Sequence, residues 1–233
     1  MTLEVGPVSE VVAVTGGALL VDPVSSSVGH LVEIKGVCTT GSGRYLTCDY
    51  VGADVIRNEI TAQATAAAAI DPEVDTIFEI GGQDSKFISL SHGAIVDFMM
   101  NKVCAAGTGS YLEEQAEKLG ISIRGEFGDL ALAGKNPVRL GERCTVFMES
   151  DLMAYHQKGA ARENLIAGLC YAIVHNYLNR VVGKRKIGRR VMFLGGPSLN
   201  KGVVAAFEDV LGRGLIVPKH REVLGAFGAA VCL

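Results

Sequence analysis

The sequence contains no apolar run of membrane-spanning length, no low-complexity tract and no strong excess of either charge. A membrane helix needs about 20 consecutive apolar residues, so a membrane-spanning protein is excluded. The N-terminus is too polar for a secretory signal peptide, which leaves the cytoplasm as the expected location. A net charge of −3 gives no reason to expect nucleic acid or an anionic membrane as a partner.

Cysteine pairs of the CxxC type are also missing, although the chain has six cysteines. They are scattered, at Cys38, Cys48, Cys104, Cys144, Cys170 and Cys232. In a chain of 233 residues without a secretion signal, free thiols or metal ligands are expected rather than disulfides. With 48% hydrophobic and 20% charged residues, the chain can bury a substantial core in one large or two small domains.

The most informative stretch is a predicted β-hairpin with glycines at its tip. Residues 76–80 and 86–90 have strand character, and between them stand Gly81, Gly82, Gln83 and Asp84. Glycines let a ligand approach the main chain, and converging N–H groups bind anions. Glu79 and Asp84 would add the hard oxygen ligands that suit the Mg²⁺ accompanying a phosphate. A plain β-turn on an edge strand is the alternative interpretation.

A loop of small residues, 101–109, follows a third predicted strand at 94–98 and leads into a helix over 110–119. It contains Gly107 and Gly109, and it places the thiol of Cys104 near the positive N-terminal end of that helix. This end of a helix dipole favours a thiolate over a thiol. The two motifs together therefore point to a ligand-binding region rather than to a simple turn.

The rest of the chain alternates between predicted strands and helices. Strands are expected at 11–14, 18–21, 31–37, 191–194 and 215–217, and helices at 53–70, 142–158, 161–182, 201–211 and 223–232. Residues 39–44 are expected to form a turn, residues 195–200 a loop, and residues 120–140 a variable insert.

Several long motifs occur in a fixed order along the chain. They are TGSGR from Thr40, GADVIRNEITAQA from Gly52, EIGGQDSK from Glu79, NKVCAAGTGSYLEEQA from Asn101, GERCTVFMESDL from Gly141 and LGGPSLN from Leu194. Together they resemble the BadF/BadG/BcrA/BcrD ATPase family, which contains 2-hydroxyacyl-CoA dehydratase activators and ATPase subunits of benzoyl-CoA reductases. The resemblance extends from about residue 36 to the last residue.

The resemblance implies an α/β actin-like ATPase fold, ribonuclease H-like and shared with acetate and sugar kinases and heat-shock chaperones. In that fold two lobes flank a nucleotide cleft, and the first lobe opens with a phosphate-binding motif of the form D-x-G-S-T. This motif is missing here, so the chain is expected to be truncated at its N-terminus. Residues 1–72 would be a remnant of the first lobe, and residues 73–233 would form the second lobe with the remaining nucleotide motifs.

The resemblance also implies roles for residues around an ATP or ADP molecule and Mg²⁺. Gly81, Gly82 and Gln83 would belong to the second phosphate motif, in which many relatives have aspartate at the position of Glu79. The adenosine motif would consist of Gly195, Gly196 and Asn200, and Gly107 and Gly109 would contact the cofactor. Glu59 would orient the attacking water, with Asp84 as the second catalytic candidate. A surface glutamate is the alternative for Glu59.

Cys104 and Cys144 match the two family cysteines that bind one 4Fe–4S cluster shared by a homodimer. Such a cluster takes about four thiolates, and a two-fold axis doubles the two that one chain supplies. Spacing alone would favour two buried core cysteines. Cys170 and Cys232 are interpreted as packing residues, and Cys38 and Cys48 have no assigned role.

Three functions are considered. The first is an ATP-dependent activator that donates a low-potential electron from the shared cluster to a dehydratase or reductase component. The second is a nucleotide- or cluster-binding module without ATPase activity of its own, which the missing motif would explain. A small-molecule kinase is disfavoured because no kinase role requires Cys104 and Cys144.

Overall fold

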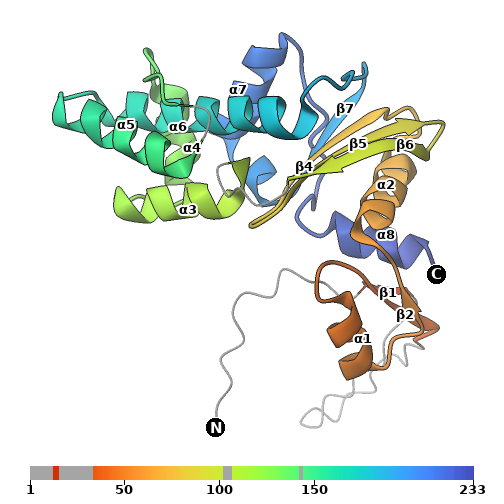
Figure 1. Ribbon diagram of the computed structural model, residues 1–233. Helices are drawn as coiled ribbons and strands as arrows, with labels where there is room; N and C mark the ends of the chain where they lie inside the picture. The colour runs from red at the N-terminus through yellow and green to blue at the C-terminus, as the bar shows by residue number, and fades with distance from the viewer. Residues whose placement is uncertain (1–12, 16–33, 102–106, 142–143) are drawn as a thin grey trace, which may run out of the picture. The chain divides into compact units, whose positions relative to one another are not determined.

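The computed structural model describes residues 13–15, 34–101, 107–141 and 144–233 (Figure 1). They belong to two compact units, Met1–Pro72 with Val223–Leu233, and Glu73–Glu222, and each is described by itself. No helix in these described ranges is long and apolar enough to cross a membrane. The sequence-based division into lobes at residue 72 stays a prediction, and the last helix groups with the first unit.

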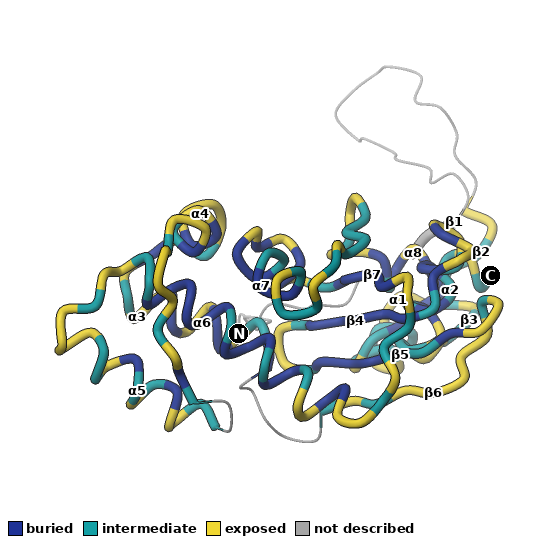
Figure 2. The backbone as a smooth tube through the Cα atoms, turned by 90° about the horizontal axis from the view of Figure 1, so that it is seen from above, coloured by how far each residue is buried: buried dark blue, intermediate teal, exposed yellow. Residues whose placement is uncertain are grey.

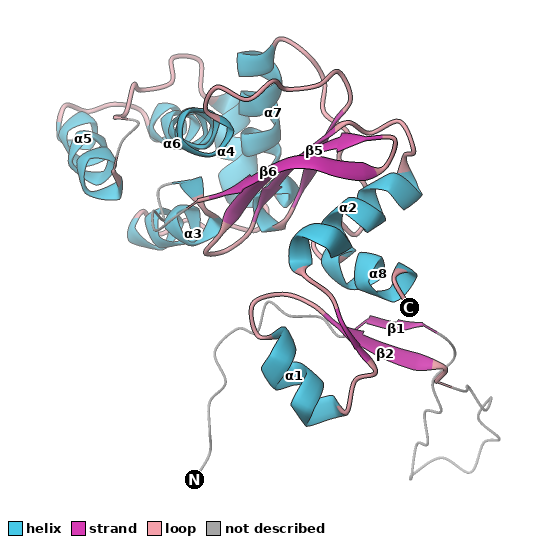
Figure 3. Ribbon diagram, turned by 45° about the vertical axis from the view of Figure 1, so that its right-hand side comes forward, coloured by secondary structure: helices cyan, strands magenta, loops and turns pink. Residues whose placement is uncertain are grey.

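The described residues of the first unit form a small sheet and three helices. Its strands are β1 (Ala13–Thr15), β2 (Gly36–Thr39) and β3 (Val55–Ile56), with β2 central, antiparallel to β1 and parallel to β3 (Figure 3). Its helices are α1 (Arg44–Val51), α2 (Glu59–Ile70) and α8 (Leu224–Val231). The predicted strand at 18–21 lies outside the described residues.

Helix α2 begins later than the sequence predicts. The predicted start at residue 53 is wrong because β-branched Val55 and Ile56 pair with β2 instead. Asn58 then caps the helix, since its Oδ1 accepts a hydrogen bond from the N–H of Ile60 at 2.8 Å. The predicted end before Asp71 and Pro72 is confirmed.

Helices α2 and α8 pack closely because small residues face each other. The buried face of α2 consists of Ala62, Ala64, Ala66 and Ala67. At Gly228 of α8, an added Cβ would lie only 1.8 Å from the carbonyl oxygen of Ala62. This contact explains the run of small residues that the sequence has at both helices.

Two segments of the first unit differ in part from the prediction. The turn expected at 39–44 is observed at residues 41–43, but the sequence does not predict helix α1, which begins at Arg44 and has no buried residue, so that no apolar pattern marks it. The strand expected at 31–37 is observed as β2, from Gly36 to Thr39, and residues 34–35 precede it without regular structure.

The second unit is built on a four-stranded sheet with the order β6-β5-β4-β7. The strands are β4 (Thr76–Ile80), β5 (Ser85–Ser91), β6 (Ala94–Met100) and β7 (Val191–Leu194), and all four predicted strands are confirmed. Strands β4, β5 and β6 are antiparallel neighbours, whereas β7 runs parallel to β4. Figure 2 shows the central strand β4 buried and the edge strand β6 largely exposed.

The expected strand at 215–217 is reduced to a single bridge. Ile216 pairs with Met192 in β7, and the Ile216 carbonyl accepts a hydrogen bond from the N–H of Phe193 at 2.8 Å. This segment therefore extends the sheet by one pair beyond β7.

The helical segments of this unit pack on one face of the sheet and extend beyond the ends of its strands. They are α3 (Gly109–Lys118), α4 (Glu126–Ala133), α5 (Thr145–Gln157), α6 (Arg162–Tyr177), a π-helical turn (Leu178–Val182), a 3-10 turn (Gly196–Leu199) and α7 (Lys201–Leu211). Helices α3, α4 and α5 lie beyond the strand ends (Figure 1). The core joins sheet and helices through aromatic rings: Phe78 lies 5.1 Å from the ring of Tyr177 in α6 and 5.5 Å from that of Phe207 in α7.

Most of these helices occur where the sequence predicts them, with ends shifted by one to a few residues. The exception is α4, which lies in the segment interpreted as a variable insert at 120–140. It is a packed helix whose Phe127 and Ala131 are buried, and it contacts α6 and α7.

Candidate functional site

The hairpin between β4 and β5 closes on the four residues that the sequence singles out. Ile80 pairs with Ser85, and the Gly81 N–H donates to the Asp84 carbonyl at 2.8 Å. Gly82 and Gln83 are exposed at the tip, and Asp84 is half-buried. The tip is further fixed by Asn101, whose Oδ1 accepts from the Ser85 N–H at 2.8 Å.

The beginning of α3 is bound directly to this tip. The N–H groups of Gly109 and Ser110 donate to the carbonyls of Gly81 and Gly82 at 2.8 and 2.9 Å, and the Ser110 hydroxyl also donates to the Gly82 carbonyl. A Cβ on Gly109 would lie 3.1 Å from the Gly81 oxygen, a tight contact that would push the hairpin tip away from α3, so glycine favours this approach. The first donors of α3 are thus used to hold the hairpin.

A third loop, residues 195–200, meets the same region. Gly195 has φ +87°, and a Cβ there would lie 2.1 Å from the carbonyl oxygen of Ile80, which precedes the hairpin tip. Asn200 caps α7, because its Oδ1 accepts from the N–H groups of Gly202 at 2.9 Å and Val203 at 3.3 Å. Its Nδ2 is buried and has no hydrogen-bond partner among the described residues.

These three segments enclose a cavity of about 470 Å³ within the second unit. Gly82, Gly109, Gly196 and Asn200 all line it, so the structure brings the predicted phosphate and adenosine motifs together. Leu112 and Glu113 of α3 form a further part of the wall. A cavity of this size is typical of a small-molecule site.

The sequence missed one wall of the cavity. Ile123, Arg124, Gly125 and Gly128 line it from the segment that begins α4. A Cβ on Gly128 would lie 3.2 Å from the Lys201 main-chain nitrogen, and Gly125 has φ +98°. In the sequence, Gly125 and Gly128, three residues apart, are the signal that could have indicated a close approach of this segment to another backbone.

A buried ion pair lies beneath the hairpin tip. Glu79 and Lys86 face each other on paired strands, with 3.0 Å between Glu79 Oε2 and Lys86 Nζ, and each side chain is only 8% exposed. The Tyr177 hydroxyl donates to the Lys86 carbonyl at 2.7 Å. Burial, together with the nearby Glu79 carboxylate, raises the pKa of Tyr177 well above its usual value, so this hydroxyl stays protonated. The predicted contact of Glu79 with Mg²⁺ stays a prediction.

Glu59 belongs to the first unit, where it is the first residue of α2. Its Oε2 lies 3.3 Å from an Arg44 guanidinium nitrogen, and both side chains are mostly buried. The Arg44 guanidinium in turn lies over the Tyr45 ring, 4.9 Å from its centroid. The structure therefore gives the predicted water-orienting glutamate a cationic neighbour, and its catalytic role stays a prediction.

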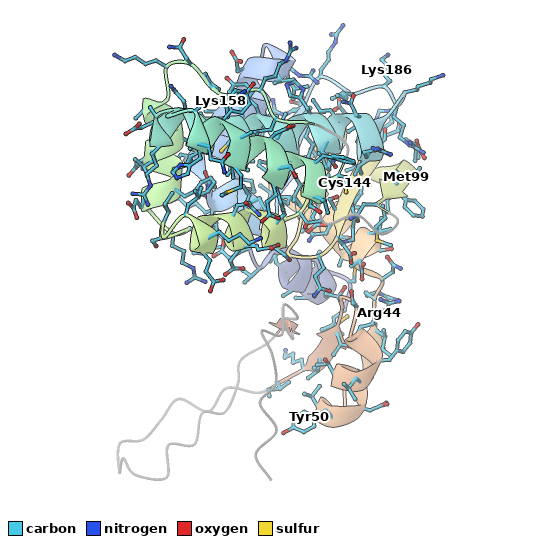
Figure 4. All side chains as sticks on the ribbon, turned by 60° about the vertical axis from the view of Figure 1, so that its left-hand side comes forward. Arg44, Tyr50, Met99, Cys144, Lys158 and Lys186 are labelled. Carbon is cyan, nitrogen blue, oxygen red and sulfur yellow. The ribbon has the colours of Figure 1, made fainter. Side chains whose placement is uncertain are left out.

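Of the two candidate cluster ligands, only Cys144 is among the described residues. It stands at the N-terminal cap of α5, half-buried, and its carbonyl accepts from the N–H of Met148 (Figure 4). Cys104 lies outside the described ranges. Within those ranges no three His, Cys, Asp or Glu side chains are grouped so that they could hold a metal ion.

The other thiols differ in their surroundings. Cys170 is buried in the middle of α6, and burial raises its pKa to about 12. Cys38 is buried against Ala62 and Ala229, and burial is the main cause of its raised pKa. Both are therefore thiols of the core rather than thiolates.

Comparison with known proteins identifies the family. The model of the BadF/BadG/BcrA/BcrD ATPase family matches residues 22–232. The chain belongs to this family. The resemblance inferred from the motifs is thereby confirmed.

Two curated relatives show the level of similarity. The chain is 34% identical to the 2-hydroxyisocaproyl-CoA dehydratase activator of Clostridioides difficile, covering 85% of this chain and 73% of the relative. It is 35% identical to the uncharacterized protein MJ0800 of Methanocaldococcus jannaschii, covering 86% of this chain. The chain spans only about half of that archaeal protein, at 49% of its length.

Solved structures of two activators have the same fold. Component A of the Acidaminococcus fermentans (R)-2-hydroxyglutaryl-CoA dehydratase matches with a TM-score of 0.79 at 32% identity, over 84% of this chain and 74% of that one. The Clostridium difficile 2-hydroxyisocaproyl-CoA dehydratase activator with bound ADPNP gives 0.78 at 33%, over 86% and 73%. The chain has the actin-like ATPase fold of these activators, as its motifs predict.

Proposed function

We propose that this chain binds ATP and ADP in the 470 Å³ cavity and acts as an ATP-dependent activator of a dehydratase or reductase component. The observation that carries the proposal is the convergence of Gly82, Gly109, Gly196 and Asn200 on one cavity. Glycines at three of these positions leave main-chain groups accessible to a nucleotide, and Asn200 lines the cavity beside them. The relative with bound ADPNP supports the same ligand class.

Within this proposal the main parts of the site have separate roles. The exposed tip of the hairpin binds phosphates, and the Asp84 carboxylate is the kind of hard oxygen that binds Mg²⁺. The wall formed by Ile123, Leu112 and the glycines of α4 covers the base and excludes water from it. Glu59 orients the water that attacks the terminal phosphate, giving ADP and phosphate.

The second part of the proposal is a 4Fe–4S cluster held by Cys104 and Cys144 together with the same residues of a second copy. The position of Cys144 fits a thiolate ligand, because the first turn of α5 offers N–H donors and the positive end of a helix dipole. When bound, such a cluster supplies one-electron transfer. The cysteines of this chain would hold it at the two-fold axis of the homodimer.

One observation favours the alternative of a nucleotide-binding module without ATPase activity. The Glu59 Oε2 already accepts a hydrogen bond from the Arg44 guanidinium at 3.3 Å, so this oxygen is held by an arginine and is not directed to a water molecule alone. Turnover of ATP by the wild type, lost in Glu59→Gln with ADP binding retained, would decide for the ATPase.

The test of the main proposal is anaerobic preparation with iron and sulfide, followed by iron analysis and calorimetric titration with ADP. We expect about four irons per dimer in the wild type and in Cys170→Ser, and almost none in Cys104→Ser or Cys144→Ser. All four proteins should bind ADP. A folded wild type without iron would refute the cluster, and a wild type that does not bind ADP would refute the nucleotide site.

A further inference from the structure

The Glu79–Lys86 pair lies at the point where the two glycine loops of the cavity meet. A Cβ built on Gly81 would lie 3.4 Å from Glu79 Oε1, and one built on Gly195 would lie 3.2 Å from the same atom. The other carboxylate oxygen, Oε2, is bound by Lys86. One oxygen of Glu79 is thus directed to the loops and the other to the lysine.

The position of this carboxylate is unfavourable for an anionic ligand. Gly82 and Gly196, which follow Gly81 and Gly195, line the cavity, and Glu79 lies directly behind the first glycine of each loop. In a buried environment, where little water screens them, two charges separated by only a few residues interact strongly. Without a partner, Glu79 would repel a phosphate group at this end of the cavity.

We propose that Lys86 is a positioning residue for phosphate binding, because its ammonium cancels the charge of Glu79 beneath both glycine loops. The pair itself adds no net charge beneath the two glycine loops, and their main-chain N–H groups can then bind an anion. The in-register pairing of the two residues on β4 and β5, and the hydrogen bond from Tyr177 to the Lys86 carbonyl, hold the ammonium in place. This inference rests on the proposed nucleotide site and assigns the residues that make it accept phosphate.

The test compares Mg²⁺-free binding of adenosine, AMP, ADP and ATP by calorimetry, with EDTA present. In Lys86→Met we expect adenosine affinity within about threefold of the wild type, ADP affinity about tenfold lower, and ATP affinity lower still. Glu79→Gln should act in the opposite direction, because it leaves the ammonium uncompensated: ADP and ATP should bind more tightly and adenosine equally. The double variant Glu79→Gln with Lys86→Met removes both charges, so its affinities for the four ligands should rank as they do in the wild type.

The opposite effects of Lys86→Met and Glu79→Gln on ADP and ATP affinity distinguish an electrostatic role of the pair from a structural one. Loss of packing would weaken all four ligands in both single variants. Lys118→Met is the matched control, since Lys118 also pairs with carboxylates, Glu114 and Glu149, but on the surface of α3. It removes the same charge from the protein and should leave all four affinities unchanged.

If Lys86→Met fails to fold, as judged by circular dichroism, Glu79→Gln and the double variant still carry the comparison. Equal losses for adenosine and ADP, or weaker ATP binding in Glu79→Gln, would overturn the proposal. The proposal would also be overturned if the wild type binds adenosine but none of the variants differs from it in affinity for the charged ligands AMP, ADP and ATP. A wild type that binds none of the four would instead refute the nucleotide site itself.

Discussion

Replacing Gly195 by alanine should destabilise the second unit strongly, and the cost can be worked out from the geometry. Gly195 has φ +87° and ψ 175°, a combination that costs a residue with a side chain about 1–3 kcal/mol. The new methyl group would also lie 2.1 Å from the Ile80 carbonyl oxygen, so the loop or the end of β4 must move by about 1 Å. Overpacking of this kind adds about 1–3 kcal/mol.

The sum is about 4 kcal/mol, a large part of the stability of a typical domain. At about 2–4 °C per kcal/mol for a unit of this size, the melting temperature should fall by about 10 °C. The assay is thermal and urea unfolding followed by circular dichroism, with ADP titration of the folded protein. Because the chain has two units, two transitions are to be separated before the shift is measured.

The neighbouring residue provides the control. No heavy atom would lie within 4 Å of a Cβ on Gly196, so Gly196→Ala should change stability by less than about 0.5 kcal/mol. Gly196 lines the cavity, however, and the methyl group should weaken ADP binding. If Gly195→Ala melted within about 2 °C of the wild type, the argument from the close approach of these two loops would be refuted.

Two further predictions concern Asn200 and Cys170. Asn200→Ala should lower the free energy of unfolding by about 1 kcal/mol because α7 loses its cap, whereas Asn200→Asp keeps the acceptor and should retain that stability. Both should weaken ADP binding, since Asn200 lines the cavity and both variants remove its amide group; unchanged ADP titrations would contradict a role of this side chain in binding. Cys170, with a pKa of about 12, should resist iodoacetamide at pH 8 in the native protein and react in urea, because the thiolate forms only at much higher pH when buried. Mass spectrometry of the labelled protein checks this, and rapid native labelling of Cys170 would contradict it.

The sequence predicts the sheet of the second unit well because each of its signals is local. Strands β4, β5 and β6 are short apolar or β-branched runs separated by glycine turns, and α7 has an asparagine cap in front and Gly212 behind. The same local signals identify the glycine loops at 81–82 and 195–196. Their convergence on one cavity follows from the parallel pairing of β4 with β7, which the chain order alone does not determine.

Helices α1 and α4 could not be predicted in the same way. Helix α1 buries no residue, so no apolar periodicity exists to detect. Helix α4 is short and contains Gly128, which lowers its helix propensity; its stability comes from packing against α6 and α7, far apart in the sequence. Since α4 forms a wall of the cavity, Ile123 and Arg124 were missed together with it.

The partner of Glu79, in contrast, follows from the sequence once the length of the hairpin loop is known. A four-residue tip over 81–84 makes Ile80 the partner of Ser85, and the next pair outward must then be Glu79 and Lys86. Opposite charges on directly paired residues attract each other, and the burial of β4 and β5 removes the water that would otherwise separate them. Considering Glu79 only as an oxygen ligand for Mg²⁺ leaves out this cross-strand neighbour. The register of the hairpin thus determines the electrostatic character of the residues directly beneath its tip.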